Sequence, residues 1–159
     1  MKIMLFSDSH GIMNNMVRML SKHKDVDLVI HLGDLVKDAL KLKESYENIP
    51  FEIISGNNDW NREYPSEKTI EAEGKKIFIT HGHHYNVKYD YQRIISRGRS
   101  ENADAVFFGH THEPEEMFSD GMMVLNPGSI ALPRPPYKPS CCLIEIADGK
   151  MVSRFLGLG

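Results

Sequence analysis

The sequence is poor in the features that mark extracellular or membrane proteins. Its 159 residues include only two cysteines, Cys141 and Cys142. Because adjacent cysteines do not form an ordinary structural disulfide, we expect a reducing, cytoplasmic setting in which both act as small apolar strand residues. No apolar run approaches the ~20 residues of a membrane-spanning helix, so we expect no association with a membrane.

An excess of charge of one sign is also absent. The 19 lysines and arginines face 22 aspartates and glutamates, which gives a net charge of −3 with neutral histidines. This balance offers no broad cationic surface for a long polyanion, so we do not expect a nucleic-acid partner. The length fits one domain, and we expect residues 1–159 to form it.

Apolar runs and helical patterns alternate along the first sixty residues. Continuous apolar runs, typical of strands covered on both faces, predict strands over 2–6, 28–32 and 51–54. Helices are predicted between them over about 14–22, capped by Asn14 or Asn15, and over about 38–46. This order predicts an α/β fold with a parallel sheet.

The rest of the chain is richer in predicted strands. A hairpin is predicted over 68–73 and 76–80, followed by a helix over about 89–99 and a strand over 105–108. Four short strands then follow, over 117–118, 122–125, 141–146 and 151–156. No repeat or interdomain linker interrupts the chain.

Polar side chains that can bind metal follow one predicted strand after another. They are Asp8, His10, Asp34, Asn57, Asp59, His81, His110 and His112. Since the carboxyl ends of strands in an α/β sheet line one edge, we expect these residues to meet there. Leaving Asp59 aside as a residue that orients the loop, seven ligands remain, which are too many for a tetrahedral structural zinc.

Such a ligand set suits two divalent ions that share one ligand. Asp34 is the natural bridge, because a carboxylate offers two oxygens. Imidazoles and carboxylates without a thiolate favour Mn, Fe, Zn or Co over calcium. Two such ions are used for displacement at phosphorus, where they activate the nucleophile and neutralise charge.

Five motifs in this order resemble those of the calcineurin-like metallophosphoesterase superfamily. They are Asp8-Ser9-His10, Gly33-Asp34, Gly56-Asn57-Asn58-Asp59, His81-Gly82-His83 and Gly109-His110-Thr111-His112. The short chain and the segment Asn126-Pro127-Gly128-Ser129 are similar to its small YfcE-like phosphodiesterase branch. The resemblance implies a four-layer αββα sandwich with two mixed β-sheets.

The resemblance also implies a role for each ligand. One ion would be held by Asp8, His10, Asp34 and His112, and the other by Asp34, Asn57, His81 and His110. A hydroxide bridging the two ions would attack phosphorus in line. We expect Mn²⁺ first, with Fe, Zn, Co or Ni as alternatives, and a small phosphodiester as substrate.

Other functions remain open beside the phosphodiesterase. Relatives with this fold include the retromer subunit of vacuolar protein sorting, which serves as a non-catalytic assembly scaffold. A nuclease or nucleotide pyrophosphatase would use the same centre. All seven ligand positions hold competent residues, which favours an enzyme. A homo-oligomer is also open, with the proline-rich loop 126–139 as a candidate contact.

One position departs from the superfamily pattern. Asn58 stands where many members carry a histidine that protonates the leaving group. A neutral amide donates a hydrogen bond but is not a useful general acid. We therefore treat Asn58 and His83 as the candidate catalytic residues, with His83 or its neighbour His84 as the substitute acid.

Several further residues have both a functional and a structural interpretation. His31 is expected to be a hydrogen-bonded core histidine. Lys88, Arg97 and Arg99 fit a solvated helix face or a phosphate contact. Asn126 and Arg134 fit the rim of the site or the packing of their loop.

Overall fold

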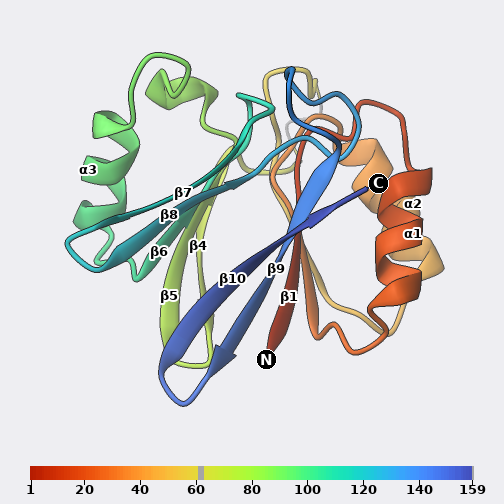
Figure 1. Ribbon diagram of the computed structural model, residues 1–159, viewed down its shortest axis with the longest axis horizontal. Coiled ribbons are helices and arrows are strands. Elements are labelled where there is room, and N and C mark those ends of the chain that lie inside the picture. The colour runs from red at the N-terminus through yellow and green to blue at the C-terminus, as the bar shows by residue number, and fades with distance from the viewer. Residues whose placement is uncertain (61–62, 159) are drawn as a thin grey trace.

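Two five-stranded sheets lie face to face in the computed structural model, which describes residues 1–60 and 63–158 (Figure 1). The first sheet has the order β10 (Lys150–Gly157), β9 (Ser140–Ala147), β1 (Lys2–Phe6), β2 (Leu28–His31), β3 (Phe51–Ile53). The second has the order β4 (Glu67–Ala72), β5 (Lys75–Thr80), β6 (Ala105–Phe107), β8 (Met122–Pro127), β7 (Pro114–Ser119). Helices cover the outer faces, so the expected αββα sandwich is confirmed.

Each sheet contains three parallel strands and two strands that are joined by antiparallel pairing. In the first sheet β1, β2 and β3 are parallel, while β9 and β10 are antiparallel. In the second sheet β5, β6 and β8 are parallel, and the edge strands β4 and β7 are antiparallel. Both sheets are therefore mixed, and the loops that carry the motifs follow their parallel strands.

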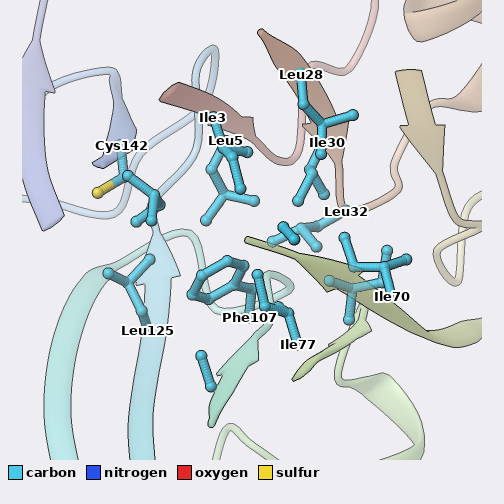
Figure 2. Close-up of a cluster of buried hydrophobic side chains, with 14 of the residues drawn as sticks. Ile3, Leu5, Leu28, Ile30, Leu32, Ile70, Ile77, Phe107, Leu125 and Cys142 are labelled. Carbon is cyan, nitrogen blue, oxygen red and sulfur yellow. The ribbon is translucent and has the colours of Figure 1, made fainter. Parts of the chain in front are cut away.

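The apolar core follows from the alternation of side chains along each strand. In β1, Ile3 and Leu5 face the second sheet, whereas Met4 and Phe6 face the helices on the other side. Figure 2 shows Ile3 and Leu5 opposite Phe107 and Leu125 in the layer between the sheets. Burial on both faces explains why β1 reads as a continuous apolar run rather than an alternating one.

The first two helices begin without a cap from a neighbouring side chain. In α1 (Asn14–Lys22) no side chain caps the first turn, so the predicted asparagine cap is wrong. The Asn15 amide instead donates to the carbonyl of Ile130. In α2 (Val36–Ser45) the helix begins two residues earlier than predicted, because Asp59 accepts the N–H of Val36 at 2.7 Å.

The third helix also differs at its start. α3 (Gln92–Ser100) begins three residues later than predicted, after a 3₁₀ turn over His83–Tyr85. Asp90 accepts the N–H of Gln92 and fixes that boundary. Within the described part, no helix is long and apolar enough to cross a membrane.

The two cysteines lie in β9, as predicted. Both thiols are free and buried. Burial raises the pKa of Cys142 to about 12 and that of Cys141 further, so neither is a reactive thiolate at neutral pH.

Candidate metal centre

The loops after β1, β2, β5 and β6 converge on one cluster of carboxylates and imidazoles. Five of the seven candidate ligands have a left-handed backbone, with φ between 43° and 71°: Asp8, His10, Asp34, His110 and His112. This region costs a non-glycine residue about 1–2 kcal/mol. Concentration of this conformation on the polar loops indicates a functional constraint on where these side chains point.

Glycine allows these loops to approach one another. At Gly109 a Cβ atom would stand 1.9 Å from the Ser7 hydroxyl. At Gly56 it would stand 2.1 Å from the Asp34 carboxylate. The motif glycines are therefore fixed by close backbone approach to the residues that form the cluster.

One group of donors is formed by Asp8, His10 and His112. The Nε2 atoms of His10 and His112 are 3.3 Å apart. The Oδ1 atom of Asp8 lies 3.1 Å from Nε2 of His112 and 3.8 Å from Nε2 of His10. Residues 102 positions apart in the chain thus place their donor atoms at one point.

A second group is formed by Asp8, Asp34 and His81. The Nε2 atom of His81 lies 3.5 Å from Oδ2 of Asp34 and 3.0 Å from Oδ1 of Asn57. The Asp34 carboxylate also lies 3.9 Å from Nε2 of His10, so it faces both groups. This is the placement that a bridging carboxylate requires.

His110 lies beside the second group rather than within it. Its ring centroid is 5.1 Å from that of His81, and its backbone N–H donates to Asp8. Burial, aided by the nearby His81 and Lys88, lowers the pKa of His110 to about 4, so the ring is neutral at pH 7. A neutral ring keeps a lone pair available for a metal.

Backbone carbonyls set the tautomers of two candidate ligands. The Nδ1 atoms of His81 and His112 lie 2.7 Å and 2.6 Å from the carbonyl oxygens of Leu32 and Leu132. Because a carbonyl only accepts, Nδ1 carries the proton and the lone pair of Nε2 faces the cluster. This is the arrangement found around metal-binding histidines.

The charges of the cluster are those expected of a site built for cations. Burial acts to raise the pKa of Asp8, but contacts with His10 and His112 hold it far below its ordinary value. Burial acts to lower the pKa of His81, and the carboxylates of Asp34 and Asp8 raise it overall. Both shifts show that the carboxylates attract positive charge at this point.

The buried Oδ1 atom of Asp8 has no hydrogen-bond partner among the described residues. A buried carboxylate oxygen without a partner is costly unless a cation satisfies it. Together with the inward-facing Nε2 atoms, this atom shows that the residues present fit divalent metal ions.

A buried hydrogen-bond network braces the first motif. His31 accepts the N–H of Gly33 on Nδ1, so its Nε2–H donates to the Ser9 hydroxyl at 3.1 Å. Ser9 in turn donates to Asp38 at 2.8 Å, and Asp38 also accepts the N–H of Gly11. His31 is thus the satisfied core histidine that the sequence suggested. Asp38 was missed, because a helical aspartate carries no local signal of this contact.

Asp59 orients backbone amides, as expected. Its carboxylate accepts the N–H groups of Asp34 at 2.9 Å and Gly56 at 2.7 Å, besides that of Val36. One side chain therefore ties together the loops after β2 and β3.

Asn126 braces the last motif from the opposite side. Its amide donates to the carbonyl of Gly109 and to the hydroxyl of Thr111, both at 2.9 Å. The residue is fully buried, so it packs the turn and does not line the rim of the site.

The two candidate catalytic residues lie beside the cluster. Asn58 binds Asp34 twice, through its backbone N–H at 2.9 Å and its side-chain amide at 2.6 Å. The ring centroid of His83 is 5.4 Å from that of His81. Burial, with the neighbouring His84 and His81, lowers the pKa of His83 to about 4. Asn58 thus holds the carboxylate of Asp34, the candidate bridge, and His83 is a neutral ring.

The cluster does not line a large hollow at the other end of the first sheet's helices. A hollow of about 590 Å³ lies between the C-terminal ends of α1 and α2, lined by residues such as Tyr46 and Ile49. It contains no histidine or aspartate. Chemistry rather than volume therefore identifies the candidate site.

The sequence and the fold are similar to those of known proteins. Residues 1–149 match the profile of the calcineurin-like phosphoesterase superfamily domain. A phosphodiesterase of Methanocaldococcus jannaschii is 34% identical over 80% of this chain and 83% of its own length. The crystal structure of a predicted phosphoesterase from Streptococcus pneumoniae superposes with a TM-score of 0.84 at 30% identity, covering 98% of this chain and 88% of that one.

A structural likeness without close sequence similarity is also found. Vps29 of Entamoeba histolytica, solved in complex with zinc, has a TM-score of 0.79 and covers 99% of both chains. Its identity is 22%, so this likeness shows the shared fold alone.

Proposed function

Because the chain belongs to the calcineurin-like phosphoesterase superfamily, we propose that it is a metal-dependent phosphodiesterase acting on small phosphodiesters. The observation that carries the proposal is the convergence of Asp8, His10, Asp34, His81 and His112 on two adjoining donor groups. The similarity to an archaeal phosphodiesterase supports the choice of a diester.

We assign the ligands as the motifs suggest. Asp8, His10 and His112 would hold one ion, Asn57, His81 and His110 the other, and Asp34 both. We expect Mn²⁺, with Fe, Zn, Co or Ni as substitutes, since the donors are imidazoles and oxygens. When bound, two such ions activate water and neutralise charge on the phosphoryl oxygens.

The residues of the chain supply orientation rather than a strong acid. Asn58 holds the Asp34 carboxylate in place through two hydrogen bonds. His83 is neutral at pH 7, so it donates a proton poorly. We therefore expect phenolic leaving groups to react well and alkoxide leaving groups to react slowly.

Hydrolysis of bis(p-nitrophenyl) phosphate tests the proposal directly. The metal-stripped protein should be inactive, and added Mn²⁺ should restore turnover of the diester more than that of p-nitrophenyl phosphate. The Asp34→Ala variant should be inactive, and Glu44→Ala, an exposed change on α2, should match the unaltered protein. A preference for the monoester would contradict the proposal of a diesterase.

A second candidate function is a non-catalytic assembly scaffold. The fold shared with Vps29 motivates it. The intact donor groups and the inward-facing Nε2 atoms favour the enzyme. Absence of turnover with every divalent metal, in protein that binds a defined partner tightly, would reverse this choice.

A further inference from the structure

Four basic residues that the sequence marks as candidates for a phosphate contact or for the rim of the site differ in what they contact. Arg97 pairs with Glu67 and Glu101, and Arg99 pairs with Asp120. Lys88 and Arg134 are exposed, and neither forms an ion pair with another residue of the described chain. The first two cations are used to hold α3 in place, and the other two remain available for a ligand.

Lys88 and Arg134 line one small hollow. It measures about 210 Å³ and is completed by Val87, Tyr91, Thr111 and Glu113. The Tyr91 ring packs on Phe108 at a centroid distance of 5.3 Å, and Val87 is buried, so one wall is firm. The volume suits a phosphate or a similarly small charged group, not a nucleobase with its sugar and phosphate.

The hollow adjoins the candidate metal centre through the last motif. Thr111 lies between the candidate ligands His110 and His112 in the chain. The backbone N–H of Arg134 donates to the carbonyl of His112 at 3.2 Å. A ligand with one group at the candidate metal centre and another in the hollow therefore needs only a short connection between the two groups.

We propose that Lys88 and Arg134 form a subsite for a second anionic group of the substrate. The inference rests on the proposed phosphodiesterase activity and narrows its substrate class. The preferred substrate is then a small phosphodiester whose organic part carries a further phosphate or carboxylate. Glu113 places one negative charge against two positive ones, so the hollow favours a single anionic group.

A matched pair of chromogenic diesters tests the subsite. Thymidine 5′-(p-nitrophenyl phosphate) and its 3′-phosphorylated form share the leaving group and differ only in the extra phosphate. The unaltered enzyme should hydrolyse the 3′-phosphorylated form with the higher kcat/KM. Lys88→Gln and Arg134→Gln should each reduce this preference about tenfold, as expected for loss of a charge-assisted hydrogen bond, and leave the unphosphorylated diester nearly unchanged.

Two further variants check the sign of the charge effect. Glu113→Gln removes the opposing charge and should raise the preference for the 3′-phosphorylated diester. Arg93→Gln removes an exposed arginine outside the hollow and should leave the preference unchanged. Equal kcat/KM for the two diesters, or equal losses on both in Lys88→Gln and Arg134→Gln, would overturn the subsite while leaving the phosphodiesterase intact.

A binding measurement separates the subsite from the reaction. Calorimetric titration with thymidine 3′,5′-bisphosphate and thymidine 5′-monophosphate requires no turnover. Tighter binding of the bisphosphate, lost in Arg134→Gln, would support the subsite even if neither diester were hydrolysed. In that event the proposed phosphodiesterase activity would be refuted, and the subsite would stand. Equal affinity for the two nucleotides would overturn the subsite.

Discussion

The candidate centre has two halves that are built in opposite ways. The half on the first sheet supplies Asp8, His10, Asp34 and Asn57, and therefore both carboxylates. The half on the second sheet supplies only imidazoles, those of His81, His110 and His112. In the first half, backbone N–H groups donate directly to the carboxylates of Asp8 and Asp34. Asp59 and Asp38 hold the same loops in place by accepting other backbone N–H groups. In the second half backbone carbonyls orient His81 and His112.

This difference follows from what each ligand type needs. A carboxylate only accepts hydrogen bonds, so N–H donors hold it in place. A neutral imidazole must donate from one nitrogen to present the lone pair of the other. His81 connects the halves, since its Nδ1–H reaches the carbonyl of Leu32 on the first sheet. The groups that orient each ligand therefore match its chemistry, with N–H donors around the carboxylates and carbonyl acceptors beside the imidazoles.

The strongest test of this comparison removes the carboxylate that faces both halves. Asp34→Ala should lose both ions and reduce kcat by more than about 10³-fold, beyond the about 10–100-fold that loss of an outer partner costs. Metal content per chain, measured by mass spectrometry of the metals, checks it. Glu44→Ala should keep full content. Retention of both ions by Asp34→Ala would refute the bridging role.

A weaker effect should follow from removing the brace of the first half. Asp38→Ala leaves Ser9 and the N–H of Gly11 without their acceptor, so metal affinity should fall about 10–100-fold. Competition with a chelator measures this affinity, and the loss should fall on the ion held by Asp8 and His10. The matched change in the second half, Asn126→Ala, breaks only neutral hydrogen bonds and should cost less. Equal losses in the two variants would remove the distinction between the halves.

The pH dependence of the metal-free protein should reflect two sets of histidines, those that burial keeps neutral and those that the carboxylates of the first half favour in the protonated form. Burial lowers the pKa of His31, His83 and His110 to about 4, so their contribution to stability is lost as pH falls from 6.5 toward 4. The pKa values of His81 and His112 are raised by Asp34 and Asp8, so their contribution is full below 6.5 and lost as pH rises through the folded value.

The stability of the stripped protein should therefore peak near pH 6.5. Because metals bind unprotonated imidazoles, the stability of the protein with Mn²⁺ should rise above this pH instead of falling. Thermal unfolding at about pH 5, 6.5 and 8, with and without Mn²⁺, tests both limbs. A stability that keeps rising to pH 8 without metal would show that the carboxylates do not raise the pKa values of His81 and His112.

The smallest effect on the rate is expected from replacing Asn58, which orients Asp34 and stands where many members of the superfamily carry the acid for the leaving group. Asn58→His introduces an acid but removes one amide bond to Asp34, so rates should change by only about a few-fold. Diesters with alkoxide leaving groups should gain, and those with nitrophenolate should not. An equal change for both leaving groups would place Asn58 away from the leaving group. His83→Asn, in parallel, should have little effect, because the ring is already neutral.

The positions of the strands and of the metal motifs were predictable from sequence. Strands such as Lys2–Phe6 are apolar on both faces, and the polar residues that follow them stand out against that pattern. The start of α2 was not predictable, because the acceptor for its first turn comes from Asp59, 23 residues away. The predicted cap at Asn14 or Asn15 is absent for the same reason, because the Asn15 amide donates to the carbonyl of Ile130, far along the chain.

The sequence by itself thus determined the order of strands and helices and the candidate donor residues, because both depend on local hydrophobic pattern and side-chain chemistry. The arrangement in four layers was expected only from the resemblance to the superfamily. Only the tertiary structure decided which groups face one another. It placed Asp34 toward both groups of histidines and joined Asp38 and His31 in the network that holds the first motif. It also showed that Arg97 and Arg99 form ion pairs, whereas Lys88 and Arg134 form none with the described residues and line one hollow. These contacts join residues from distant parts of the chain, so no local pattern encodes them.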